Sequence, residues 1–187
     1  MVEKFALVSV SDKTDIIEFV RILVKHKYNI ISTGGTAKYL EDAGIKVIEA
    51  GDYTNMKQSN LLKTMHHKIS GGLFYAGEDK QSKQFRKDLQ LNKITIVVNN
   101  FYLEDKAAFF ETIDVGGPTM TRTAAKMGLL NGSVAVITSH KQYEQVVKEI
   151  EHGEITKETK HNLAIEAFKL LRNYNIKIVD YLLEKYK

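Results

Sequence analysis

The chain has 187 residues, of which 43% are hydrophobic and 27% charged, and it contains 1 proline, no tryptophan and no cysteine. This length is enough to bury an apolar core, and the lack of cysteine excludes disulfides, thiolate zinc sites and a cysteine nucleophile. No apolar run reaches the roughly 20 residues of a membrane span or the apolar core of a signal peptide, so we expect a cytoplasmic protein with no membrane partner.

The 27 basic and 23 acidic residues leave a formal net charge of +4. The sequence has no long basic run and no basic segment interleaved with aromatic residues, so nucleic acid is not an expected partner. Ordinary solubility explains the small excess of lysine and arginine. The alternative is that a few convergent lysines attract an anionic small molecule.

Short β-like runs alternate with helix-like periods along most of the chain. The expected strands lie at 5–10, 28–31, 46–48, 94–98 and 134–137. Between the first two strands, residues 14–27 carry apolar side chains three and four apart, which predicts a helix that Ser11 or Asp12 would cap. Strands that alternate with helices predict an α/β fold: a doubly wound, mostly parallel sheet sandwiched by helices.

After Gly153 the pattern changes to a long amphipathic segment. Apolar residues from Leu163 to Leu182 share one face, and Thr156 is the expected N-cap of the one or two helices that they form. This face must pack on the sheet domain, on a partner subunit or on both. We therefore predict one domain, with an α/β core at 1–153 and a helical C-terminal extension at 154–187.

Two strand-to-helix turns are rich in hydroxyl groups and glycine. The first turn provides Ser9, Ser11 and Lys13, and the second provides Ser32, Thr33, Gly34, Gly35 and Thr36. Because the carboxyl ends of parallel strands open on one edge, both turns can offer donors to the same phosphate. The alternative is a pair of plain turns, with Thr36 as a helix cap and Lys13 in solvent. The second turn is neither a Walker A loop nor a GxGxxG motif.

Lys63 and Thr64 belong to a second polar segment, which continues into the adjacent His66 and His67. Neighbouring residues on a strand face opposite sides, and no carboxylate stands at a metal-binding spacing. Ordinary hydrogen-bonded histidines are therefore favoured over metal ligands, and no metal is expected.

A third segment places Asp114 before the turn at 116–118, and then puts Arg122 and Lys126 four residues apart on one helix face. Pro118 suits the first turn of that helix. A carboxylate and two cations could thus surround one pocket. On spacing alone, a surface helix with a solvated basic stripe is slightly favoured.

In order along the chain, these motifs resemble those of IMP cyclohydrolase, the N-terminal domain of the bifunctional enzyme AICAR transformylase/IMP cyclohydrolase of purine biosynthesis. The resemblance rests on the segments 6–13, 32–36, 63–66 and 114–126, and on a helical tail at 158–168 with Tyr174. It implies a methylglyoxal-synthase-like fold, no metal and no organic cofactor. It also implies a homodimer. The transformylase domain of the family is not expected in this chain, which leaves a separate formyltransferase as a further partner.

The implied reaction is the last step of de novo purine biosynthesis, in which 5-formamidoimidazole-4-carboxamide ribotide closes to IMP with loss of water. By resemblance, the first two turns hold the 5′-phosphate, and Lys63 and Thr64 lie at the reacting base beside a charged pair, Asp114 and Lys126. Lys63 would stabilise or protonate the formyl oxygen, Asp114 would accept the amide proton, and Lys126 would keep that carboxylate ionised. The other implied substrate contacts are Asn99, Phe101, Tyr102, Gly116, Gly117 and Arg122.

The sequence also departs from the family pattern. Leu61 stands where the family has an arginine, Ser70 where it has a histidine and Met127 where it has an asparagine, and the pocket tyrosine is replaced by Phe101 or displaced to Tyr102. These departures motivate a second hypothesis, a non-catalytic domain of the same fold that senses a nucleotide or phosphate. Methylglyoxal synthase itself is the third hypothesis.

Overall fold

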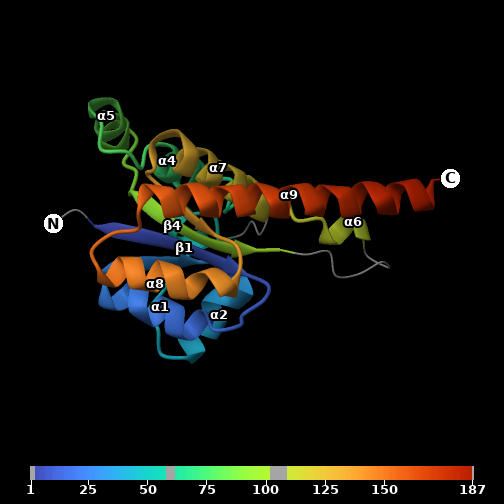
Figure 1. Ribbon diagram of the computed structural model, residues 1–187, viewed down its shortest axis with the longest axis horizontal. Helices are drawn as coiled ribbons and strands as arrows, with labels where there is room; N and C mark the ends of the chain where they lie inside the picture. Colours follow the sequence, from blue (N-terminus) through green and yellow to red (C-terminus); the bar gives the residue numbers. More distant parts are fainter. Residues whose placement is uncertain (1–2, 58–61, 102–108, 187) are drawn as a thin grey trace.

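The computed structural model describes residues 3–57, 62–101 and 109–186, and its strands and helices alternate along the chain as expected (Figure 1). The strands are β1 (Lys4–Val10), β2 (Tyr28–Ser32), β3 (Ile48–Glu49), β4 (Ile94–Asn100) and β5 (Ala135–Ile137). The helices are α1 (Ile16–Lys25), α2 (Gly34–Asp42), α3 (Ala50–Thr54), α4 (His67–Phe74), α5 (Lys80–Asp88), α6 (Phe109–Thr112), α7 (Gly116–Asn131), the short 3-10 helix η1 (His140–Gln142), α8 (Tyr143–Glu151) and α9 (Lys157–Lys185).

The strands form one sheet with the order β3-β2-β1-β4-β5, in which all four neighbouring pairs are parallel. The chain moves outward from β1 through β2 to β3, and then crosses back to add β4 and β5 on the other side. This reversal opens a crevice beyond the carboxyl ends of β1 and β4, the usual ligand position in such sheets. In Figure 1 the strands run from left to right, so that crevice lies at the right-hand edge of the sheet.

Alternating side chains of the buried strands build two apolar layers. Ala6 and Val8 of β1 pack with α1, α2 and α8 on one face, whereas Phe5 and Leu7 pack with α4, α7 and the first half of α9 on the other. Figure 1 shows these two groups of helices below and above the sheet. The predicted doubly wound, parallel α/β fold with a helical C-terminal part is therefore confirmed.

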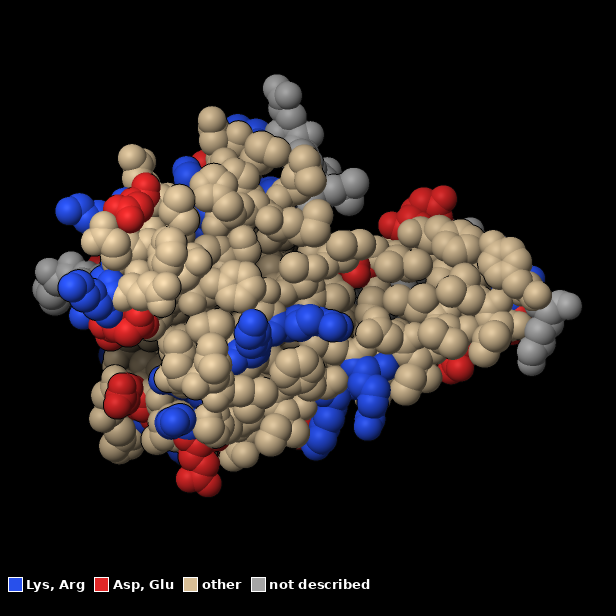
Figure 2. Space-filling view, turned by 90° about the horizontal axis from the view of Figure 1, so that it is seen from above, with Lys and Arg blue, Asp and Glu red and all other residues tan. Residues whose placement is uncertain are grey.

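The C-terminal amphipathic segment is a single helix of 29 residues, α9. Its expected cap is confirmed, since Thr156 Oγ1 accepts the Thr159 N–H at 3.1 Å. Ala164 and Ala167 are fully buried against α7 and the sheet, so the first half of the helix belongs to the core. The second half projects as an arm beyond the body, and the face of this arm seen in Figure 2 carries little charge. The division of the chain at 153/154 stays a prediction.

The cap expected for the first helix is wrong. Asp15, in the left-handed conformation, is the N-cap of α1, and no side chain caps it. The Asp12 carboxylate instead accepts the N–H and hydroxyl of Thr14 at 2.9 and 2.6 Å, a local turn that competes with capping. Within the described ranges, no helix combines the length and apolar character that crossing a membrane requires.

Candidate functional site

A cavity of about 800 Å³ lies beyond the carboxyl ends of β1, β2 and β4. Its lining brings together most of the residues expected at the site, from the two hydroxyl-rich turns, the segment before α4, the end of β4 and the start of α7. These are Ser9, Ser11, Lys13, Thr33, Gly34, Gly35, Thr36, Lys63, Thr64, Asn99, Asp114, Gly116 and Gly117. The volume lies within the range of small-molecule sites.

Hydroxyl groups fasten the turns after β1 and β2 to each other. The buried Thr36 hydroxyl donates to Val10 O at 2.9 Å and accepts the Val10 N–H at 3.1 Å. Ser9 Oγ and Thr33 Oγ1 lie 2.6 Å apart. The two turns therefore form one preorganised wall of the cavity.

The second turn presents the N-terminus of α2 to this cavity. The first N–H groups of a helix have no partner in a preceding turn, and they carry the positive end of the helix dipole, so Gly34 and Gly35 offer donors to an anion. Lys13 adds a cation at the same wall, with its Nζ 3.5 Å from Ser11 O and 5.9 Å from the centre of the Tyr39 ring. This wall suits a phosphate.

Two asparagines at the end of β4 order the neighbouring loops. Asn100 Oδ1 accepts the N–H groups of Ser11 and Asp12 at 2.8 and 2.9 Å, which fixes the turn after β1. The buried Asn99 donates from Nδ2 to Gly117 O at 2.9 Å and to Thr121 Oγ1 at 2.8 Å. The Asn99 amide nitrogen thus holds the start of α7 beside the sheet.

Asp114 stands just before α7, where its carboxylate is largely enclosed. Burial raises its pKa above the usual value, against the opposing effect of the N–H groups of Gly117 and Gly116. The Gly117 N–H donates to Asp114 Oδ1 at 2.9 Å. A carboxyl group with a raised pKa is a stronger base than an ordinary aspartate, which suits it to proton abstraction.

The glycines that follow Asp114 allow close approach of three segments. A Cβ at Gly116 would collide with the Thr64 hydroxyl, and a Cβ at Gly117 would collide with the Asp114 carboxylate. Thr64 follows Lys63 directly, so these contacts place the lysine segment against the start of α7. Side chains at these glycines would push the candidate base and the lysine apart.

Helix α9 supports Asp114 through a hydrogen bond to its backbone. The Asp114 N–H donates to the Tyr174 hydroxyl at 2.6 Å. The Tyr174 ring is buried and meets the Phe101 ring edge-on, with centroids 4.9 Å apart. The C-terminal helix therefore helps to fix a residue of the cavity from 60 positions away in sequence.

Lys63 reaches the cavity with its ammonium group held by a carboxylate that the sequence did not single out. Its Nζ donates to Glu49 Oε1 at 2.8 Å, and its side chain is only 11% exposed. Burial by itself would raise the pKa of the Glu49 carboxyl, but hydrogen bonds from Lys63 and the Gly51 N–H outweigh burial and hold that pKa below its usual value. Glu49 is therefore a carboxylate that neutralises the lysine.

Several expected site residues do not line the cavity. Ser32 is fully buried and donates to Val8 O at 2.8 Å, so its hydroxyl is used within the sheet. Phe101 is buried against Tyr174 and Leu171. The structure does not place Tyr102, which lies outside the described residues, as does Leu61, one of the departures from the family pattern.

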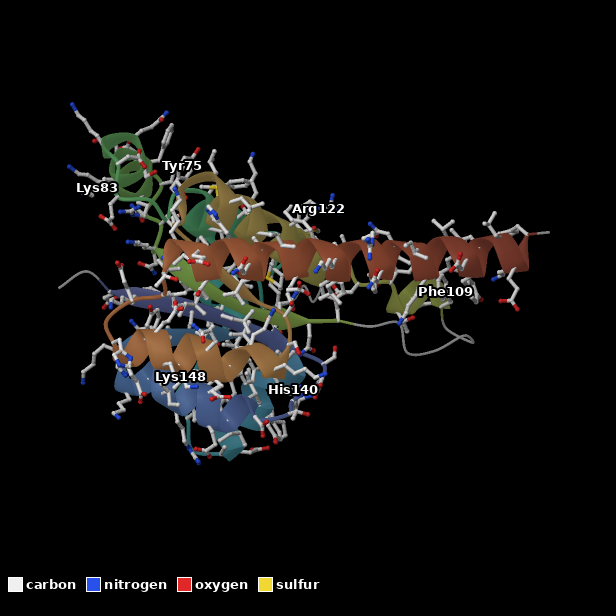
Figure 3. The ribbon with its side chains drawn as sticks, viewed as in Figure 1. Tyr75, Lys83, Phe109, Arg122, His140 and Lys148 are labelled. Atoms are coloured by element: carbon white, nitrogen blue, oxygen red, sulfur yellow. The ribbon has the colours of Figure 1, made fainter. Side chains whose placement is uncertain are left out.

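The two cations on α7 also lie away from the cavity. Figure 3 shows Arg122 on the outer side of the helical layer, pointing away from the sheet. Lys126 is exposed, with its Nζ 5.8 Å from the centre of the Phe74 ring, and no ion pair joins it to Asp114 in the described structure. Lys126 follows Gly117 by 9 positions, which is about 13.5 Å along the helix axis and separates the lysine from the cavity end.

The structure also adds residues that the sequence reasoning missed. Asn100, Glu111 and Thr112 line the cavity, and Glu49 lies behind Lys63. The adjacent asparagines Asn99 and Asn100 stand at the end of an apolar strand, and this pattern could have indicated that Asn100 lies at the cavity. Nothing local in the sequence links Glu49 to Lys63.

Two other cavities lie in the described part of the chain, and neither is lined by the hydroxyl-rich turns. One of about 510 Å³ lies at the opposite, amino end of the sheet, where parallel α/β folds gather helix C-termini and their carbonyl groups. The other, of about 800 Å³, lies between α8 and the start of α9, and Glu149, Glu158 and Glu166 in its lining do not suit an anionic ligand. His66 Nδ1 accepts the Lys68 N–H at 3.2 Å, as expected of an ordinary hydrogen-bonded histidine. Among the described residues, no three metal-ligating side chains gather at one point.

Comparisons with known proteins find relatives over almost the whole chain. The bifunctional purine biosynthesis protein PurH of Prochlorococcus marinus (strain MIT 9515) is 38% identical over 188 residues, covering 95% of this chain and 36% of that protein. PurH of Ligilactobacillus salivarius (strain UCC118) is also 38% identical, covering 96% of this chain and 37% of that protein. The chain thus spans little more than a third of the length of these relatives. A solved structure titled "Crystal structure of ForH" superposes with a TM-score of 0.88 at 28% identity, covering 96% of this chain and 99% of that one.

Two family models divide the chain between them. The model described as AICARFT/IMPCHase bienzyme matches residues 130–187, which together with the PurH relatives confirms the resemblance inferred from the motifs. The model described as MGS-like domain matches residues 15–129. Because that match spans more than half of its 187 residues, the chain belongs to the MGS-like domain family.

Proposed function

We propose that this chain is an IMP cyclohydrolase, which closes the ring of 5-formamidoimidazole-4-carboxamide ribotide to form IMP and water. The observation that carries the proposal is the convergence of the two hydroxyl-rich turns, Lys63 and Asp114 on one cavity of about 800 Å³. The similarity to PurH and to the AICARFT/IMPCHase bienzyme supports the same reaction.

The 5′-phosphate would bind at the wall that the first two turns build. The N–H groups at the start of α2, the Thr33 hydroxyl and the Lys13 ammonium are the donors that face the cavity there. The ribose then lies along the ends of β1 and β4, and the imidazole reaches Lys63, Thr64 and Asp114. Binding of the distant phosphate orients the reacting groups, and such orientation lowers the activation barrier of an intramolecular ring closure.

In the chemical step, the carboxamide nitrogen attacks the formyl carbon and forms the new C–N bond. Asp114 accepts a proton from that nitrogen, and the Lys63 ammonium stabilises the negative charge that grows on the formyl oxygen. The oxygen then leaves as water, whose two hydrogens come from the carboxamide nitrogen and the formamido nitrogen. The burial that raises the pKa of Asp114 also strengthens its basicity for this step.

In this proposal the Asp114 carboxylate is oriented by the N–H of Gly117 and by Tyr174 through the backbone. Lys126 is not used to orient it, because its side chain lies over Phe74.

The test is direct assay of IMP formation from the formamido ribotide by absorbance. Wild type should turn over, Lys63→Ala should lose about 10²–10³ in kcat, and Asp114→Asn about 10²–10⁴. Lys148→Ala is the matched control, since Lys148 is an exposed lysine on α8 paired with Glu144, away from the cavity (Figure 3). It should keep wild-type kcat.

Three outcomes would reject the proposal in distinct ways. Wild-type turnover no faster than that of Lys63→Ala removes the enzymatic claim. Nucleotide binding without turnover would favour the sensing domain, and production of methylglyoxal from dihydroxyacetone phosphate would favour methylglyoxal synthase.

A further inference from the structure

Glu49 joins three parts of the cavity wall through one carboxylate. Its Oε1 accepts the Lys63 ammonium at 2.8 Å and lies 3.5 Å from the N–H of Gly34, at the start of α2. Its Oε2 accepts the N–H of Gly51 and so caps α3. A single side chain thus contacts the phosphate-binding turn, the proposed catalytic lysine and the helix that follows β3.

We infer that Glu49 is a positioning residue for the cyclisation, which holds the Lys63 ammonium in place and links it to the phosphate-binding turn. This inference rests on the proposed function of the cavity. Glu49 itself does not line the cavity and so acts through Lys63 rather than on substrate.

The burial of this pair explains why a partner is needed. The Lys63 side chain is 11% exposed and that of Glu49 31% exposed, so the ammonium has lost most of its contact with water. An ammonium that has lost most of its contact with water needs another hydrogen-bond acceptor, and a buried charge left without one is costly. Glu49 is that acceptor, and it therefore fixes the position from which Lys63 stabilises a growing oxyanion.

The contact with Gly34 adds a link between binding and chemistry. A phosphate seated at the start of α2 takes the same N–H group that Glu49 approaches at 3.5 Å, a weak contact. Glu49 then remains with Lys63 and Gly51. Phosphate binding at the start of α2 therefore changes one contact of Glu49, the residue that positions Lys63.

Other charged groups surround Lys63 as well. Lys13, Glu111 and Asp114 line the same cavity, and His66 and Lys68 follow along the chain. Among the described residues, only Glu49 forms an ion pair with Lys63. Its substitution therefore isolates the proposed effect.

The test compares Glu49→Gln, Glu49→Asp and the control Glu144→Gln. Glutamine keeps an oxygen that can accept the Gly51 N–H, so the cap of α3 survives while the charge is lost. Glu144 pairs with Lys148 on the surface of α8, so its replacement removes an equivalent charge without touching the cavity. The variants are assayed for kcat and KM.

Glu49→Gln should lower kcat by about tenfold to 10²-fold, the scale of a misplaced catalytic group, with a smaller change in KM. Glu49→Asp keeps the negative charge and should recover at least part of kcat. Glu144→Gln should match wild type.

A second readout does not depend on turnover. The Lys63 side chain is followed by NMR of lysine labelled at Cε, with the resonance assigned by its loss in Lys63→Arg. Its chemical shift should change in Glu49→Gln and not in Glu144→Gln. An unchanged chemical shift together with wild-type kcat in Glu49→Gln would overturn the role of Glu49, while turnover by the wild type would leave the proposed function intact. A wild type without turnover would instead overturn the proposed function, and the chemical shift would still test the contact between Glu49 and Lys63.

Discussion

Replacing Tyr174 by phenylalanine removes one hydroxyl that connects α9 to the candidate base. That hydroxyl accepts the Asp114 N–H at 2.6 Å, and the ring around it is only 4% exposed. Phenylalanine keeps the edge-on contact with the Phe101 ring, whose centroid lies 4.9 Å away, so the packing is retained. The variant therefore isolates a single hydrogen bond.

The magnitude follows from leaving the Asp114 N–H without its partner. An unsatisfied donor of this kind costs about 1–3 kcal/mol of unfolding free energy. For a chain of this size, each kcal/mol lowers Tm by about 2–4 °C, so a loss of several degrees is expected. Because the backbone of Asp114 is loosened, kcat for ring closure should also fall, by about tenfold.

The assay pairs urea or thermal unfolding with IMP formation. Tyr186→Phe is the control, since it makes the same change at the C-cap of the same helix. Tyr186 is 70% exposed, and surface substitutions of this kind stay within about 0.5 kcal/mol. A Tyr174→Phe protein as stable and as active as Tyr186→Phe would refute the view that α9 holds Asp114 in place.

Three further predictions concern the cavity. Burial raises the pKa of Asp114 above that of an ordinary aspartate, and a general base loses activity when the pH falls below its pKa. The acid limb of kcat/KM should therefore lie above about pH 4, and it should disappear in Asp114→Asn. Gly117→Ala should lower kcat by about 10²-fold or more, since the added Cβ displaces the Asp114 carboxylate; an active Gly117→Ala enzyme would contradict that close approach. Lys13→Ala should raise the Kd for IMP by about tenfold in calorimetry, with the nucleoside inosine unaffected, because only the phosphate meets that cation.

The fold could be predicted because its strands carry a strong apolar signal. Segments such as 94–98 and 134–137 are apolar on both faces, as strands covered by helices on both sides must be. Parallel strands then place their carboxyl ends on one edge, which brings the turns at 9–13 and 32–36 together without any knowledge of side-chain contacts.

The parts of the site that could not be predicted depend on contacts distant in sequence. Glu49 and Lys63 lie 14 positions apart, and Asp114 and Tyr174 lie 60 apart, so no local pattern connects them. The pairing of Asp114 with Lys126 came from the family resemblance, and the structure places Lys126 farther along α7 and over Phe74. Ser32 could not be assigned from sequence for a similar reason. A hydroxyl next to a glycine turn can bind a ligand or donate a hydrogen bond within the sheet, and Ser32 donates to Val8 O.

The most direct measurement of the central claim is a crystal structure of this chain with IMP. We expect the 5′-phosphate at the start of α2, within hydrogen-bonding distance of the Gly35 N–H, and the six-membered ring between Lys63 and Asp114. Nucleotide bound at the amino end of the sheet, or bound with its base away from both side chains, would contradict it.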